Sequence, residues 1–517
     1  MKSKWLAIFF AVSYIGVFAV IGLLVAYIGF CDPDTCWHLA LGKWIYQHQA
    51  LPMRDVFSTN VFAMVHVSDR LPLMQHEWFS DLLFYSVFAS SGARGLLVFT
   101  ALLATLSLGI LPAILLRRNN VPRAMVIVLT IAATLASGFR MWVRPEQFSF
   151  LCLSSLALIQ DFTATATGRR ALGICISFTF AIMVLWTNMH ALFLVGIAYC
   201  LLLVCTGFLS GDDYNLVGRR TAIFISAALA TLSTPWGSAL WSYMMRLLGS
   251  SYTHTNKENG PITFHDLTHP TFIPLLLFEV IVWTILVLRH ASTSVGALRR
   301  RSEPLLLALA GTLLVLFFRR LTPLGLIVMY FAIARSYNLG NEAVSKPDEP
   351  EPAVRRWLRQ LDMPLGRLGM PGSWLSSSAC LLTAAIVCLA TSWFMVAPAI
   401  PAPSRLFVPP VQALQYLEEN QPAGRILNDS KYGSMMTWCM NHPPDIFIDG
   451  RFDSFDRTLI ADYNSMRLCR PGWRHLLDKY KIRTVFFPAA APIVLSLKED
   501  AGWHVEFADS DSVILRR

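Results

Sequence analysis

The sequence predicts a polytopic α-helical membrane protein of about eleven spans, followed by a small extracytoplasmic α/β domain at the C-terminal end. Of its 517 residues, 55% are hydrophobic and only 15% are charged, which lies outside the usual range of soluble globular proteins. Apolar runs of roughly 20 residues, long enough to cross the hydrocarbon core of a bilayer, recur as far as Val396. Beyond Val396, short helix-like and strand-like runs alternate, as in a small soluble domain.

The predicted spans follow these apolar runs. They lie near residues 5–30, 94–116, 124–139, 147–164, 171–188, 191–208, 221–235, 272–288, 303–318, 322–335 and 374–397. The first run is too long for the core of a signal peptide, and no small-residue cleavage site follows it. We therefore expect it to be retained as a span.

Basic clusters in alternate connections give the orientation. They are Lys2 and Lys4, then Arg117, Arg118 and Arg123, then Arg169 and Arg170, then Arg219 and Arg220, then Arg299, Arg300 and Arg301, and last Arg355, Arg356, Arg359 and Arg367. Arginine and lysine favour cytoplasmic loops, so the N-terminus is predicted to be cytoplasmic. The formal charge of +10 forms no basic face with interleaved aromatic residues, so we expect no nucleic-acid partner.

This orientation predicts four regions. Residues 1–335 form a transmembrane domain with extracytoplasmic loops 31–80 and 236–271, 336–373 a cytoplasmic linker, 374–397 the last transmembrane helix, and 405–517 an extracytoplasmic α/β domain. In that domain the predicted helices are Val411–Glu419, Arg457–Met466, Trp473–Tyr480 and Pro492–Glu499, and the predicted strands are Arg425–Leu427, Ile446–Ile448, Thr484–Phe487, Val505–Phe507 and Ser512–Leu515. Asp449, Gly450 and Arg451 follow a strand-like run, where α/β domains often contact ligands, although turn formation would also explain them.

The ten cysteines show no CxxC pair and no metal-ligand spacing. If the predicted orientation holds, Cys31 with Cys36, and Cys439 with Cys469, face an oxidising compartment in which disulfides form. Free thiols are the alternative for both pairs.

An acidic motif, Asp32-Pro33-Asp34, opens the first long loop. The segment after it places Trp37, Leu41 and Ile45 on one helical face, as an interfacial helix would. Capping of that helix is the alternative role for both aspartates. Further polar candidates in this loop are His38, Asp55, His76 and Glu77.

This layout resembles that of the polytopic GT-C glycosyltransferases, in particular the protein O-mannosyltransferase and lipid A aminoarabinose transferase type with its uncharacterised bacterial relatives. The shared features are the acidic motif, the interfacial helix, the helix start at His76-Glu77-Trp78 and the break at Ser90-Ser91-Gly92. The resemblance implies an inverting transfer of a sugar from a polyprenyl-phosphate lipid to an extracytoplasmic lipid, glycan or protein. It also implies acid/base roles for Asp34 first and Asp32 second, and Asp-Pro-Asp in place of the family's frequent Asp-Glu keeps both candidates open.

Departure of a phosphate calls for cations, and arginine binds phosphate oxygens bidentately. The candidates near the predicted outer surface are Arg140, Arg144, Glu146, His190, Arg319 and Arg320. Snorkelling to lipid headgroups is the alternative for Arg140 and Arg319. Pairing with Arg144 is the alternative to substrate contact for Glu146, and capping of a helix end is the alternative for His190.

The remaining expectations concern cofactors, location and rival functions. We expect no required cofactor, because His254, His265, Asp266 and His269 in the second loop lack a tight metal-ligand spacing. The resemblance implies a multi-pass protein of the bacterial inner membrane, with polyprenyl-phosphate sugar, acceptor and membrane lipid as partners. A non-catalytic receptor or assembly subunit, or a lipid transporter of the cell envelope, would share much of this layout.

Overall fold

The computed structural model describes residues 32–53, 55–58, 74–248, 260–263, 266, 269, 272–290, 302–344, 410–422, 424–452, 455 and 457–517. The chain divides into two compact units, each built from segments that are distant in the sequence. The described residues of the first unit fall in Leu97–Gly237 and Asn256–Ala402. Those of the second fall in Phe30–Leu96, Ser238–Thr255 and Pro403–Arg517.

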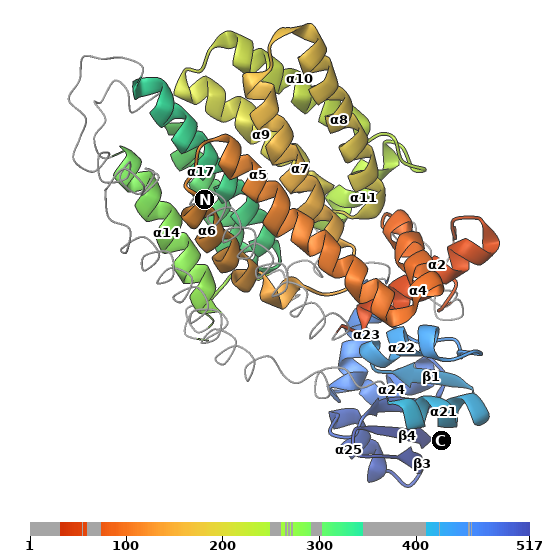
Figure 1. The fold of residues 1–517 in the computed structure, drawn as a ribbon. Coiled ribbons are helices and arrows are strands. Elements are labelled where there is room, and N and C mark those ends of the chain that lie inside the picture. Colours follow the sequence, from red (N-terminus) through yellow and green to blue (C-terminus); the bar gives the residue numbers. More distant parts are fainter. Residues whose placement is uncertain are drawn as a thin grey trace. The chain divides into compact units, whose positions relative to one another are not determined.

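Apolar helices make up the first unit (Figure 1). They are the end of α4 (Trp78–Ala104), η2 (Thr105–Ile110), α5 (Leu111–Arg118), α6 (Arg123–Ala136), α7 (Glu146–Thr165), α8 (Gly168–Met189), α9 (Phe193–Ser210), α10 (Tyr214–Ala230), α14 (Ile273–His290), α16 (Ser302–Phe317) and α17 (Thr322–Val344). In the described part of the chain, four segments are long and apolar enough to cross a membrane: Trp78–Arg118, Glu146–Thr165, Gly168–Met189 and Phe193–Ser210. The helices therefore indicate a membrane protein.

Each predicted span between 94–116 and 322–335 overlaps one of these helices. The predicted break at Ser90-Ser91-Gly92 is also present, since Gly92 has φ 64° and interrupts the helical backbone of α4. The first and last predicted spans and most of the linker 336–373 lie outside the described residues. The number of about eleven spans and the orientation thus stay predictions.

Close backbone contact and buried charge pairs hold this unit together. A Cβ on Gly311 of α16 would lie 2.8 Å from the backbone oxygen of Gly325 on α17, so both positions need glycine. At Glu303 of α16 two arginines converge, Arg220 of α10 at 2.6 Å and Arg335 of α17 at 2.9 Å. These pairs offset the cost of burying charge and fix how three helices meet.

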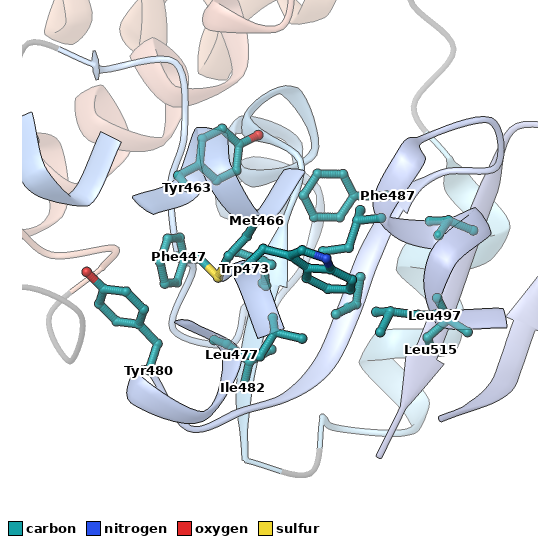
Figure 2. Packing of buried hydrophobic residues seen from close by; sticks show 14 of the residues in the cluster. Phe447, Tyr463, Met466, Trp473, Leu477, Tyr480, Ile482, Phe487, Leu497 and Leu515 are labelled. Atoms are coloured by element: carbon teal, nitrogen blue, oxygen red, sulfur yellow. The ribbon is translucent and has the colours of Figure 1, made fainter. Parts of the chain in front are cut away.

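The second unit contains a four-stranded sheet with the order β1-β2-β4-β3. β1 (Arg425–Asn428) pairs in parallel with β2 (Ile482–Pro488), whereas β4 (Ser512–Arg516) runs antiparallel to both β2 and β3 (His504–Ala508). The helices in this region are α21 (Val411–Glu419), α22 (Ser430–Cys439), α23 (Arg457–Arg467), α24 (Trp473–Lys479) and α25 (Pro492–Lys498). Figure 2 shows Tyr463, Trp473 and Phe487 in the buried cluster between helices and sheet.

One predicted element in this region is wrong, and one helix was not predicted. Ile446–Ile448 is not a strand, because its backbone bonds to a side chain: Phe447 N–H donates to Asn428 Oδ1 at 2.8 Å, and the carbonyl of Ile448 accepts from Asn428 Nδ2 at 2.7 Å. The sequence reading also missed α22, which Asp429 caps through its side chain on Lys431 N. The other predicted helices and strands match the structure to within a few residues.

The first loop belongs to the same unit as the sheet. Its helix α2 (Asp34–His48) buries Trp37, Leu41 and Ile45 together, as its periodicity predicted. α2 packs against α22. The indole of Trp438 on α22 also meets the ring of Phe88 on α4 edge to face, with 5.1 Å between centroids. The unit is completed by α11 (Ala239–Leu248).

Candidate functional site

The two aspartates of the acidic motif differ in their surroundings. Asp32 is 3% exposed, and its Oδ1 accepts from Asp34 N–H at 3.1 Å, so Asp32 makes the local capping bond expected at a helix start. Asp34 is half-buried in the first turn of α2, where the positive end of the helix dipole stabilises a carboxylate. Asp34 is therefore the better placed of the two to act on a second molecule.

Gly450 lies directly against the Asp34 carboxylate. A Cβ at this position would collide with Asp34 Oδ1 and would lie 3.3 Å from Trp37 Nε1. That indole nitrogen is buried and has no hydrogen-bond partner within the described part of the chain. A carboxylate, an indole N–H donor and the bare backbone of Gly450 thus come together, which is a set of groups suited to holding a hydroxyl compound.

A buried charge network fixes the segment that carries Gly450. Arg451 is 3% exposed and donates from Nη2 to Asp449 Oδ2 at 2.6 Å and to both oxygens of Asp55 at 3.2 Å. Asp55 also accepts from Phe57 N–H at 2.9 Å and from Ser58 Oγ at 2.6 Å. The carboxylate of Asp55 is therefore occupied by the protein itself and joins the first loop to the segment 449–451.

A second buried pair joins the loop helix α2 to the first turn of α4. His38 Nδ1 is 2.6 Å from Asp81 Oδ1, and both side chains are almost wholly buried. His76 and Glu77 make local contacts: His76 Nδ1 donates to the carbonyl of Met74 at 3.2 Å, and His76 Nε2 lies 3.7 Å from Glu77 Oε1. The His76 ring also lies 5.7 Å from the Tyr243 ring of α11, measured between centroids.

In the first unit, Glu146 joins two of the predicted arginines. It forms an ion pair with Arg140, and Arg320 Nε donates to the same oxygen, Oε2, at 3.3 Å. The Glu146 side chain is 0% exposed whereas that of Arg320 is 27% exposed. Arg320 is therefore the more accessible side chain of this pair. The alternative pairing of Glu146 with Arg144 is replaced by these two contacts.

His190 extends this group through a chain of hydrogen bonds. Its Nε2 is 3.5 Å from Arg320 Nη2, and because a guanidinium can only donate, Nε2 must accept. Nδ1–H then donates to Ser149 Oγ at 2.8 Å, and Ser149 Oγ also accepts from Trp186 Nε1 at 2.7 Å. His190 is also the C-cap residue of α8, and its backbone N–H donates to the carbonyl of Trp186.

The remaining two arginines have different partners. Arg319 pairs with Asp266 of the second loop, which neutralises its charge. Arg144 is 8% exposed, and its guanidinium lies 4.9 Å from the centre of the Trp142 ring, on which Arg140 also stacks at 4.9 Å. Arg140 and Arg320 thus converge on the Glu146 carboxylate, and Arg144 lies on the same Trp142 ring as Arg140. A cluster of guanidinium groups of this kind suits an anion.

The structure thus gathers the predicted residues into two sets, one in each unit. Asp32, Asp34, His38 and Asp55 lie in the second unit, and Arg140, Glu146, His190 and Arg320 lie in the first. The sequence reading missed Asp81 and Trp37 as polar partners, and it left Gly450 and Arg451 between turn and ligand roles. No local pattern links Arg451 to Asp55, since the two are 396 positions apart.

The described residues hold no group of three or more His, Cys, Asp or Glu side chains that could bind a metal ion. His254 and His265 lie outside those residues.

No protein-family model matches the sequence, and no curated protein matches it. The structure, however, resembles solved structures. One is the archaeal oligosaccharyltransferase AglB from Archaeoglobus fulgidus in complex with an inhibitory peptide and a dolichol-phosphate, with a TM-score of 0.56 at 12% identity over 92% of this chain and 69% of that one. Another is ArnT from Cupriavidus metallidurans bound to undecaprenyl phosphate, with a TM-score of 0.53 at 13% identity over 100% and 98% of the two chains.

Proposed function

We propose, on the basis of the GT-C glycosyltransferase fold that this chain shares with those structures, that it transfers a sugar from a polyprenyl phosphate to an extracytoplasmic hydroxyl acceptor. The two neighbours are recorded with dolichol-phosphate and undecaprenyl phosphate, ligands of one chemical class. At such low identity the likeness concerns the fold, so the activity is argued from this chain's own residues.

The convergence of arginines on Glu146, with one of them partly exposed, supports this proposal most directly. Arg140 and Arg320 share this one carboxylate, and the partly exposed Arg320 can turn its guanidinium to a phosphate. Arginine keeps its charge at every physiological pH, so the departing phosphate would be stabilised throughout the reaction.

The base in this proposal is Asp34. The acceptor hydroxyl oxygen attacks the anomeric carbon, the bond from that carbon to the phosphate oxygen breaks, and the hydroxyl proton passes to the Asp34 carboxylate. The polyprenyl phosphate leaves with the bonding electron pair, and the anomeric configuration inverts. Trp37 Nε1 is a donor available to an acceptor oxygen beside this carboxylate.

The test uses undecaprenyl phosphate as the probe, because the phosphate site is proposed independently of the sugar. The full-length protein is purified in lipid, and its binding is measured by native mass spectrometry for wild type and for Arg320→Gln. We expect the variant to bind about tenfold or more weakly, since a charged hydrogen bond contributes about 1.5–3 kcal/mol. Arg474→Gln is the control, because Arg474 is 58% exposed and lies in the other unit. Equal binding by wild type and Arg320→Gln would contradict the phosphate site.

A further inference from the structure

Two cysteines meet where the first loop contacts the sheet-containing part of the second unit. Cys36 is on α2, two residues after Asp34, and Cys439 is the last residue of α22. The two helices pack against each other. Cys36 is 7% exposed and belongs to the same buried cluster as Met435, Met436 and Met440, which lie on either side of Cys439.

The two thiols interact with each other through a side-chain hydrogen bond. Their interaction lowers the pKa of Cys439, because the Cys36 thiol donates to the Cys439 sulfur and stabilises its thiolate. The same interaction, together with burial, raises the pKa of Cys36. Cys439, which is exposed, is thus the more reactive nucleophile, and Cys36, which is buried, stays protonated beside it.

The other described cysteines offer no comparable pairing. Cys152, Cys175, Cys200 and Cys205 lie on helices of the first unit, and Cys469 packs against a different hydrophobic cluster from the one that contains Cys36. Cys439 and Cys469, which the sequence suggested as partners, are both free thiols here. Cys31, the other suggested partner of Cys36, lies outside the described residues.

We propose that Cys36 and Cys439 form a disulfide that ties the loop helix α2 to α22, with a disulfide-bonded thiol oxidoreductase of the extracytoplasmic compartment as the oxidant. This proposal does not depend on the proposed transferase activity. It depends on the packing of α2 on α22 and on the predicted location of both helices outside the cytoplasm.

The reaction balances as two exchanges. The Cys439 thiolate attacks one sulfur of the oxidant's disulfide, forming a mixed disulfide and releasing one thiolate of the oxidant. The Cys36 sulfur, losing its proton, then attacks the Cys439 sulfur and releases the second. The two protons from Cys36 and Cys439 end on the two thiols of the oxidant, which has gained the two electrons that the pair has lost.

The cross-link would have a local consequence for the first loop. Asp34 lies half a helical turn before Cys36 on α2, and Gly450 lies against its carboxylate. A covalent bond two residues after Asp34 on α2 would limit how far α2 can move from the segment 449–451.

The experiment traps thiols before the protein leaves the membrane. Membranes of a bacterial host expressing the full chain are treated with N-ethylmaleimide, and the purified protein is digested without reductant and analysed by mass spectrometry. We expect a peptide containing Cys36 joined to one containing Cys439, in wild type and in the matched control Cys469→Ser. Recovery of both cysteines as maleimide adducts, or a bond from Cys439 to Cys469, overturns the proposal.

A second measurement compares unfolding temperatures and does not depend on any single cysteine variant. The unfolding temperature of the purified wild type is compared with and without a reductant that cleaves disulfides. Reduction should lower it, because the bond limits the freedom of the unfolded chain. The double variant Cys36→Ser/Cys439→Ser should show no such decrease, and an equal decrease in wild type and double variant would also overturn the proposal.

Discussion

Arg451 donates from a single nitrogen, Nη2, to both oxygens of Asp55 at 3.2 Å and to Asp449 Oδ2 at 2.6 Å. All three side chains are buried, so the cost of removing their charges from water is offset only while they stay together. This group connects residues far apart in the sequence, and it holds the segment that touches Asp34.

Loss of the arginine should therefore destabilise the second unit. Arg451→Gln leaves two buried carboxylates without their cation, and we expect a loss of about 3–5 kcal/mol in the free energy of unfolding. Thermal unfolding of the purified protein measures the effect. Arg474→Gln removes an exposed pair with Asp500 and should change stability by less than about 1 kcal/mol. Similar losses for both variants would mean that the buried network has no special role.

Gly450→Ala tests the contact with the proposed base. The added Cβ collides with Asp34 Oδ1, so the carboxylate must move and sugar transfer should fall by about tenfold or more, as a small misplacement of a reacting group produces. Gly502→Ala in the same region meets only Asp500 Oδ1, at 3.3 Å, and should retain activity and stability. If Gly450→Ala retains full turnover, Gly450 does not set the position of Asp34.

Glu146→Gln should change phosphate binding and stability in opposite directions. Removal of this buried carboxylate leaves Arg140 and Arg320 with more positive charge, so undecaprenyl phosphate should bind more tightly. The same change should lower the unfolding temperature, because Arg140 loses its ion pair. Native mass spectrometry and thermal unfolding measure the two effects, and weaker lipid binding at unchanged stability would contradict the assigned roles.

The Cys439 thiol should react at lower pH than an ordinary thiol. Its lowered pKa means that thiolate is present below the usual range, and Cys36→Ala removes the donor that stabilises it. In reduced protein, the rate of Cys439 alkylation should thus decline at a lower pH in wild type than in Cys36→Ala. Identical pH profiles for the two proteins would show that the thiols do not interact.

Much of the fold could be predicted from the sequence, because local patterns determine it. Apolar runs gave the helices of the first unit from α5 to α17, and Gly92 gave the break in α4. The helix α11 was missed, because residues 236–271 were predicted to form a loop. Ile446–Ile448 was predicted wrongly because its β-branched residues do favour a strand, whereas the side chain of Asn428 takes the backbone bonds that a neighbouring strand would have made.

The candidate site was less predictable. The carboxylates and arginines were identifiable as ionisable groups beside apolar runs, but their partners were not. Glu146 seemed suited to Arg144, two residues away, and instead pairs with Arg140 and with Arg320, which is 174 positions distant. The contact of Asp34 with Gly450 depends on how the first loop packs against the C-terminal segment, which no sequence spacing encodes.

The most direct test of the central claim is turnover of a lipid-linked donor. Purified wild type and Asp34→Asn are given a panel of undecaprenyl-phosphate hexoses and pentoses with membrane-extracted acceptors, and release of free undecaprenyl phosphate is measured. We expect release by wild type with at least one donor and unchanged binding of undecaprenyl phosphate by Asp34→Asn. Turnover by Asp34→Asn should fall at least about a hundredfold, since general base catalysis contributes about 10²–10⁴-fold. Normal turnover by Asp34→Asn would contradict the central claim.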